Sequence, residues 1–216
     1  MVRLLSLGIE VFSSIIFVVR VVFIFCFFIL KQRRFSRTAM VMIFALYLTA
    51  VFSVTGIPSV MSWHMHLDLN LIPLIDIINS PLAYIRNTIL NIMLFMPLGF
   101  LLPALWKEYR FLRIIAAAGL ILSLFIEILQ IFTFRLTDVD DLITNTAGTV
   151  AGYCIGRRFA FRLPFTSQKS EAWKSSRFEP LILFGLVFLI NFCLKPVLSD
   201  AIWDRVLDSG LWEKIR

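Results

Sequence analysis

The chain has 216 residues, of which 59% are hydrophobic and only 16% are charged. Soluble domains usually contain about 45–50% apolar and about 25% charged residues, so this composition excludes an ordinary soluble domain. The net charge of +7 would suggest nucleic-acid binding in a soluble protein. In a membrane protein, however, basic residues set the orientation of the chain, so no nucleic-acid partner is predicted.

Long apolar runs separated by short polar joints predict an all-α, polytopic integral membrane helix bundle that forms a single domain over residues 1–216. We expect about six transmembrane helices, at residues 11–30, 39–57, 88–105, 114–134, 141–156 and 180–198. The fifth is short for the ~20 residues that a span needs. No clear small-residue cleavage site follows the first, so a retained helix is predicted rather than a signal peptide.

Basic residues are concentrated in three joints, at residues 31–38, 106–113 and 157–179, which hold 13 of the 21 Lys and Arg residues. These joints alternate along the chain with the remaining ones. Because positively charged joints face the cytoplasm, we predict an N-out and C-out protein with residues 58–87 and 135–140 outside.

The outer segments differ from ordinary linkers. Residues 58–87 are long and semi-apolar, and three prolines interrupt helix in them, which predicts a partly re-entrant or interfacial loop. After Pro196, apolar residues recur at helical spacing opposite charged ones, which predicts a short amphipathic helix on the outer surface.

The sequence offers little evidence for a metal or a cofactor. The three cysteines lie inside apolar runs and form no C-x-x-C pair. His64 and His66 lie beside Asp68 without a further cluster of ligands, so their role is not assigned. No cofactor is predicted, although Asp138 and Asp141 could hold a divalent cation through their oxygens.

Polar residues gather near one depth of the third and fourth spans. Asn87 and Asn91 lie one turn apart on one face of the third, and Glu127 and Gln130 share a face of the fourth. Glu127 precedes Arg135 by eight residues, or roughly 12 Å along a helix. It therefore lies in the outer leaflet, where a carboxylate costs about 2.5–3.5 kcal/mol unless it is paired, protonated or hydrated.

The fifth span carries a single stripe that is polar at its outer end. Asp141, Asn145, Gly148 and Gly152 recur at i, i+4, i+7 and i+11. The glycine end of this stripe predicts close approach of a neighbouring helix.

Structural roles remain open for individual residues of this group. Asp138 can be an N-cap, Asp140 can face water, and Arg135 can serve only to neutralise an acid. Gln130 and Asn91 can serve only to bond helix to helix. Their convergence on one depth nevertheless favours a single outward-facing site, because ionisable residues within membrane spans usually have a function.

Several of these positions match a known family in order and spacing. The segments are N-x-x-x-F-x-P-L-G-F-L-L-P (Asn91–Pro103), E-x-x-Q (Glu127–Gln130) and R-x-x-D-x-D-D-x-x-x-N-x-x-G-x-x-x-G (Arg135–Gly152), preceded by N-L-I-P-L (Asn70–Leu74). Over roughly residues 68–160 the chain resembles the VanZ-like family. Leu74 stands where that family often has an aromatic residue.

The resemblance implies a multi-pass protein of the bacterial plasma membrane. A member of this family is linked to low-level resistance to teicoplanin, a glycopeptide that acts on cell-wall precursors outside the membrane. The polar positions that recur in the family correspond here to Asn91, Glu127, Gln130, Arg135, Asp138, Asp141 and Asn145.

The leading hypothesis is an outward-facing polar pocket that binds or modifies a cell-envelope component, such as a lipid-linked precursor. Arg135 would bind an anionic group, and Glu127 is the candidate acid or base, because a partly desolvated carboxylate can exchange protons near neutral pH. Asp138 and Asp141 would orient Arg135. No nucleophile motif is present, so enzyme activity is left open. The alternative is a non-catalytic scaffold in which the polar cluster holds the helices together. Membrane lipids are expected partners, and the oligomeric state is not predicted.

Overall fold

The computed structural model describes residues 2–29, 35–62, 65, 69–70, 73–74, 77–78, 80–133, 137–159 and 178–208. Six long helical stretches account for most of these residues. They are α1 (Val2–Ile24) with its π-helical end η1 (Phe25–Ile29), α2 (Phe35–Thr55), α4 (Pro81–Leu105), α5 (Leu112–Gln130), α6 (Val139–Phe159), and α7 (Glu179–Leu189), which runs through the π-helical η3 (Ile190–Leu194) into α8 (Lys195–Asp208). A 3-10 turn, η2 (Lys107–Arg110), joins α4 to α5, and two short strands, β1 (Leu69–Asn70) and β2 (Thr137–Asp138), pair with each other. The all-α prediction is confirmed.

Each predicted span lies largely within one of these helical stretches. Among the described residues, four helices are long and apolar enough to cross a membrane: α2, α4, α5 and the continuous helix Glu179–Ile202. Helix α1 contributes a shorter apolar run, Ser14–Phe28. Helix α6 is less apolar, because its first turns carry Asp140, Asp141 and Asn145.

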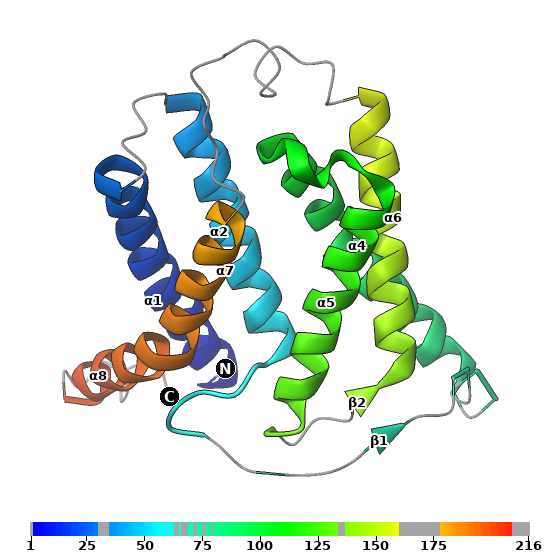
Figure 1. Cartoon of the computed structure of the whole chain (residues 1–216). Helices are drawn as coiled ribbons and strands as arrows, with labels where there is room; N and C mark the ends of the chain where they lie inside the picture. The colour runs from blue at the N-terminus through cyan, green and yellow to red at the C-terminus, as the bar shows by residue number, and fades with distance from the viewer. Residues whose placement is uncertain are drawn as a thin grey trace.

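The described helix ends that adjoin the basic joints lie together. The start of α2, the α4–α5 connection and the end of α6 are at the upper end in Figure 1, and the joints that adjoin them in the sequence hold 13 of the 21 Lys and Arg residues. The N-terminus, β1, β2 and α8 lie at the opposite end (Figure 1). The alternation of basic and non-basic joints in the sequence therefore corresponds to two separate ends of the bundle.

Helices α4 and α6 are in contact at the level of their backbones. A Cβ atom on Gly99 would lie 1.8 Å from the carbonyl oxygen of Thr149, and one on Gly152 would lie 1.9 Å from that of Met96. A Cβ on Gly148 would lie 2.4 Å from the carbonyl oxygen of Ile92. Only glycine fits at these contacts, which confirms the close approach predicted from the glycine stripe.

A buried ion pair at the basic end was not predicted. Arg37 was counted among the charges of a cytoplasmic joint, but α2 begins at Phe35 and Arg37 is buried within its first turns. Its guanidinium pairs with the carboxylate of Glu179, the first residue of α7, which also accepts a hydrogen bond from Trp106 Nε1 at 2.8 Å. The charge of Arg37, which the sequence analysis assigned to a joint, is thus buried in the core.

Phenylalanine packing holds α7 in the bundle. The rings of Phe184 and Phe188 in α7 meet those of Phe52 in α2 and Phe125 in α5 edge to face, with ring centroids 5.2–6.0 Å apart. Edge-to-face contacts of this kind each contribute about 0.5–1.5 kcal/mol beyond the buried area.

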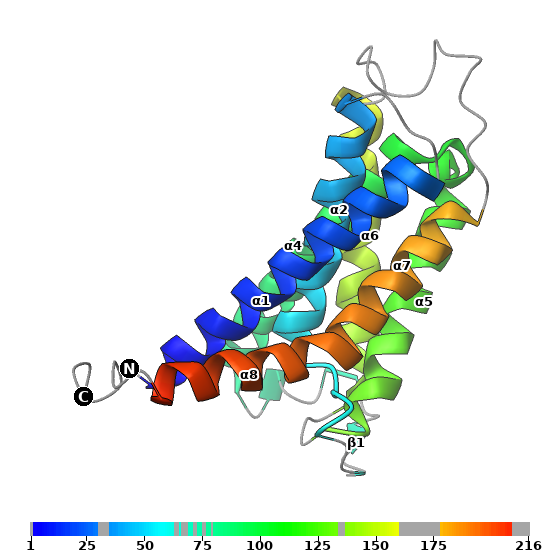
Figure 2. The ribbon, with the colours of Figure 1, turned by 90° about the vertical axis from the view of Figure 1, so that its left-hand side faces the viewer.

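The predicted helix near the C-terminus is present as α8, but it begins at Lys195 and is continuous with α7. Figure 2 shows α8 turned away from the direction of α7 and lying beside α1. The change of direction falls at η3, where five residues adopt π-helical hydrogen bonding, a common cause of kinks in helices.

Candidate functional site

The two short strands join segments that are far apart in the sequence. They pair in parallel, with Leu69 opposite Thr137 and Asn70 opposite Asp138. The side-chain amide of Asn70 donates to Asp138 Oδ2 at 3.4 Å. This ladder brings part of the predicted outer loop to the start of α6.

Asp138 caps α6 and is itself held by Glu127. Its Oδ1 accepts a hydrogen bond from the backbone N–H of Asp140 at 2.9 Å, which is the contact of a helix N-cap and confirms that reading of Asp138. Its own backbone N–H donates to Glu127 Oε2 at 3.0 Å. Because Glu127 is only 3% exposed, this carboxylate lies under β2.

Asp140 fixes the segment before α4 to the bundle. It is 6% exposed, so the reading in which it faces water is wrong. Both oxygens of its carboxylate accept from the backbone N–H of Leu74, at 2.9 and 3.2 Å. Leu74 has a φ of 67°, a left-handed conformation that costs a non-glycine residue about 1–2 kcal/mol, so this contact stabilises a strained turn.

Three other predicted residues bond helix to helix. The amide of Asn91 in α4 donates to Asp141 Oδ1 in α6 at 2.6 Å. Gln130 Nε2 donates to the carbonyl oxygen of Thr55 at 3.1 Å, and Asn145 Nδ2 donates to Ser123 Oγ at 2.9 Å. Such contacts satisfy side-chain N–H groups that lipid cannot hydrate, whereas Gln130 Oε1 and Asn145 Oδ1 have no hydrogen-bond partner among the described residues.

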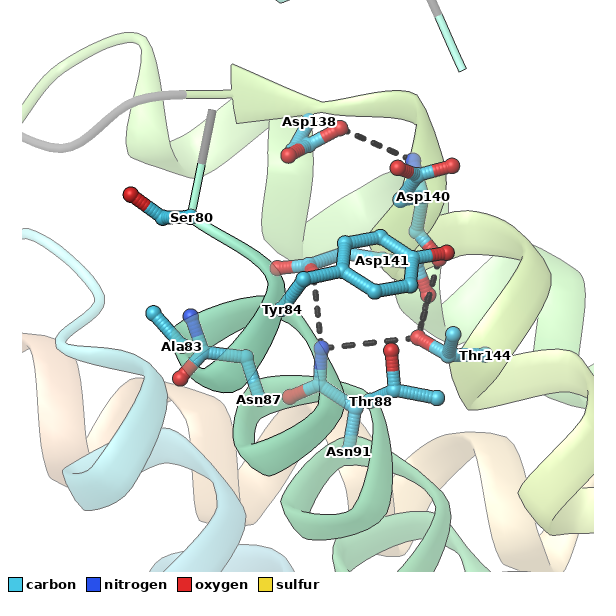
Figure 3. A pocket seen from close by; sticks show the side chains of 10 residues that line it. All are labelled: Ser80, Ala83, Tyr84, Asn87, Thr88, Asn91, Asp138, Asp140, Asp141 and Thr144. Atoms are coloured by element: carbon cyan, nitrogen blue, oxygen red, sulfur yellow. Dashed lines mark hydrogen bonds between the residues drawn. The ribbon is translucent and has the colours of Figure 1, made fainter. Parts of the chain in front are cut away.

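A polar pocket of ≈180 Å³ opens beside these contacts, between the start of α4 and the start of α6 (Figure 3). Its lining consists of Ser80, Ala83, Tyr84, Asn87, Thr88, Asn91, Asp138, Asp140, Asp141 and Thr144. Most of these side chains carry an oxygen that can accept a hydrogen bond, and three are carboxylates. The pocket therefore suits a group that offers N–H or O–H donors.

The lining only partly matches the residues predicted from the sequence. Among the seven predicted site residues, Asn91, Asp138 and Asp141 line the pocket. Glu127, Gln130 and Asn145 are buried and do not line it, and Arg135 lies outside the described residues.

Sequence reasoning passed over several lining residues. Tyr84 and Thr88 lie seven and three residues before the predicted Asn91 and so share its face of α4, and Thr144 lies one turn after the predicted Asp141. This helical spacing could have identified them.

Within the described residues, no three His, Cys, Asp or Glu side chains are grouped as metal ligands would be. His64, His66 and Asp68 lie outside those residues.

Fold and site together define a helical membrane protein with a polar pocket at one end of its bundle. The chain belongs to the VanZ/LLP1 family, whose profile matches residues 44–161, more than half of its length and more than the stretch expected from the motifs alone. It is 40% identical over 98 residues to Protein VanZ of Enterococcus faecium, a match that covers 45% of this chain and 56% of that protein. No solved structure matches the chain.

Proposed function

We propose that the polar pocket at the β1–β2 end binds a component of the outer cell envelope, and that this binding lowers susceptibility to glycopeptides such as teicoplanin. The single observation that carries the proposal is the acceptor-rich pocket of ≈180 Å³ assembled from α4, β2 and α6. Carboxylate, amide and hydroxyl oxygens accept hydrogen bonds from peptide N–H groups, ammonium groups and sugar hydroxyls. A lipid-linked cell-wall precursor presents all of these donors at the membrane surface.

Membrane orientation supports this assignment. The proposal places the bundle in the bacterial plasma membrane with six spans and with both termini outside. The helix ends that adjoin the basic joints lie opposite to β1 and β2 (Figure 1), and positively charged joints are retained in the cytoplasm. The pocket then opens toward the compartment in which glycopeptides and cell-wall precursors meet.

One of the predicted roles is modified by the geometry. Glu127 does not line the pocket and accepts a hydrogen bond from the backbone of Asp138, so we propose that it positions β2 and, through it, the carboxylate of Asp138. Arg135 follows α5 and precedes β2 in the chain, and it keeps its proposed role of binding an anionic group of the same ligand.

The test replaces a residue that lines the pocket, in the protein expressed in a teicoplanin-susceptible bacterium. Asn87 is exposed and lines the pocket, so Asn87→Leu should leave membrane abundance unchanged and return the minimum inhibitory concentration of teicoplanin to that of cells without the protein. Arg86→Gln is the matched control, since the side chain of Arg86 is next to Asn87 in the sequence and exposed but does not line the pocket. Normal abundance with unchanged resistance in Asn87→Leu would refute the proposal.

The scaffold alternative is favoured by the contacts that tie helices together. Hydrogen bonds between different helices are donated by the side chains of Asn91, Gln130 and Asn145. A cluster with a purely structural role would make the same hydrogen bonds. Glu127→Gln separates the two readings, because it nearly keeps shape and acceptor. Lost abundance supports the scaffold, whereas normal abundance with lost resistance supports the site.

A further inference from the structure

A second polar pocket, of ≈290 Å³, lies between the segment after α2 and the bend that joins α7 to α8. It shares no lining residue with the pocket of the proposed function. Its polar lining consists of Ser59, Ser62, Asn191, Lys195 and Asp200. Its charged groups therefore include both an ammonium and a carboxylate, unlike those of the first pocket.

The walls of this second pocket are fixed by backbone contacts. The backbone N–H of Val60 donates to the carbonyl oxygen of Phe192 in η3 at 3.0 Å, which ties the turn after α2 to the π-helical bend. The hydroxyls of Ser59 and Ser62 lie 2.8 Å apart within that turn. Single-turn π-helical segments occur frequently at functional sites, and here one supplies Asn191 to the lining.

Asn191 carries an acceptor that the described protein does not satisfy. The residue is 3% exposed, and its Nδ2 donates to the carbonyl oxygen of Val187 at 2.8 Å. Its Oδ1 is buried and has no hydrogen-bond partner among the described residues. Buried polar groups in proteins are nearly always paired, and an unpaired one calls for a missing donor. Because Asn191 lines the pocket, a ligand there lies next to this side chain.

The surroundings of the pocket indicate what the ligand is. Exposed apolar side chains surround the pocket. Met61 lines it, and Val60 and Val197 adjoin lining residues in the sequence; all three are 50–58% exposed. Apolar side chains left exposed beside charged ones are typical of a membrane interface, where lipid headgroups reside. A headgroup that offers an anion to Lys195 and a donating cation to Asp200 and Asn191 matches the lining.

We propose that this pocket binds the headgroup of a zwitterionic aminophospholipid. The phosphate lies against Lys195 and the serine hydroxyls, and the primary ammonium donates to Asp200 and to Asn191 Oδ1. The inference does not depend on the proposed function, because it concerns other residues and a different ligand.

The test compares three lipids with identical acyl chains by native mass spectrometry of the purified full-length protein. Phosphatidylethanolamine has both the charge and the N–H donors. Phosphatidylcholine has the positive charge without a donor, and phosphatidylglycerol has hydroxyl donors without the positive charge. We expect phosphatidylethanolamine to bind about tenfold more tightly than either, which corresponds to one well-formed polar contact.

Variants assign the preference to this pocket. Asn191→Leu keeps a similar side-chain volume and should remove most of the preference for phosphatidylethanolamine. Asp200→Asn should do the same, and as an exposed position it provides the test if Asn191→Leu fails to fold. Lys107→Gln, an exposed cation at the other end of the bundle, should leave the preference unchanged. Equal binding of the three lipids, or a preference that survives Asp200→Asn, would overturn the proposal.

Discussion

Replacement of Gly152 by alanine tests the packing that positions the pocket. Gly152 lies on α6, and its Cβ would lie 1.9 Å from the carbonyl oxygen of Met96 and 2.8 Å from its carbonyl carbon. Real Cβ atoms essentially never approach another heavy atom to less than 3.0 Å. Because the opposing atoms belong to the backbone, a change of rotamer cannot relieve the clash, and α4 and α6 must separate by about 1 Å.

The expected cost follows from this displacement. Overpacking of a core costs about 1–3 kcal/mol, and a clash with backbone lies at the upper end of that range. For a chain of this length, about 3 kcal/mol lowers the melting temperature by roughly 6–12 °C. The same separation would stretch the 2.6 Å contact between Asn91 and Asp141, so the pocket should be disturbed as well.

Gly185 provides a matched control, because it also lies within a helix but has nothing within 4 Å of an added Cβ. Gly185→Ala should therefore stabilise slightly, by about 0.5–1 kcal/mol, since alanine is the better helix former. The assay is thermal unfolding of both purified variants in the same detergent. A melting temperature of Gly152→Ala within 2 °C of the wild type would contradict this prediction. So would a melting temperature of Gly185→Ala as low as that expected for Gly152→Ala.

Two further predictions concern buried carboxylates. Arg37→Met should reduce the free energy of unfolding by about 3–5 kcal/mol, and with it the membrane abundance, because it leaves Glu179 buried without its cation. The double variant Arg37→Met with Glu179→Gln should recover part of this loss, since glutamine keeps the acceptor for Trp106 Nε1. If the losses of the two single variants simply add in the double variant, the pairing is contradicted. Asp140→Ala should destabilise the protein by about 1–3 kcal/mol in thermal unfolding, because it removes the acceptor of the Leu74 backbone N–H. Leu74→Gly should be neutral or stabilising, because it removes a left-handed leucine whose side chain is 53% exposed. A larger loss from Leu74→Gly than from Asp140→Ala would contradict the role given to this contact.

The helices could be predicted from the sequence because their signals are local. Apolar runs located each long helix, and the spacing of Gly148 and Gly152 predicted the close approach to α4 that the structure contains. The gathering of Asn91, Asp138 and Asp141 was also predictable, since helical periodicity and consecutive antiparallel spans placed them at one depth.

The partners of the buried charges could not be predicted in this way. Arg37 and Glu179 are 142 residues apart, and counting positive charges in joints treats every arginine there as solvated. Likewise, the bond from the backbone of Asp138 to Glu127 depends on the short β1–β2 ladder, for which two-residue strands give no periodic signal. Burial of charge and pairing over long distances are tertiary effects, and they decided which of the predicted residues line the pocket.

The most direct test of an outward-facing pocket is the accessibility of Asn87 in intact cells. Asn87→Cys is introduced after Cys26, Cys154 and Cys193 have been replaced by alanine, and cells are treated with a membrane-impermeant maleimide. An outward-facing pocket predicts labelling of Asn87→Cys in intact cells, and labelling of Ser36→Cys, which is exposed at the start of α2, only after permeabilisation. Labelling of Asn87→Cys only after permeabilisation would contradict it.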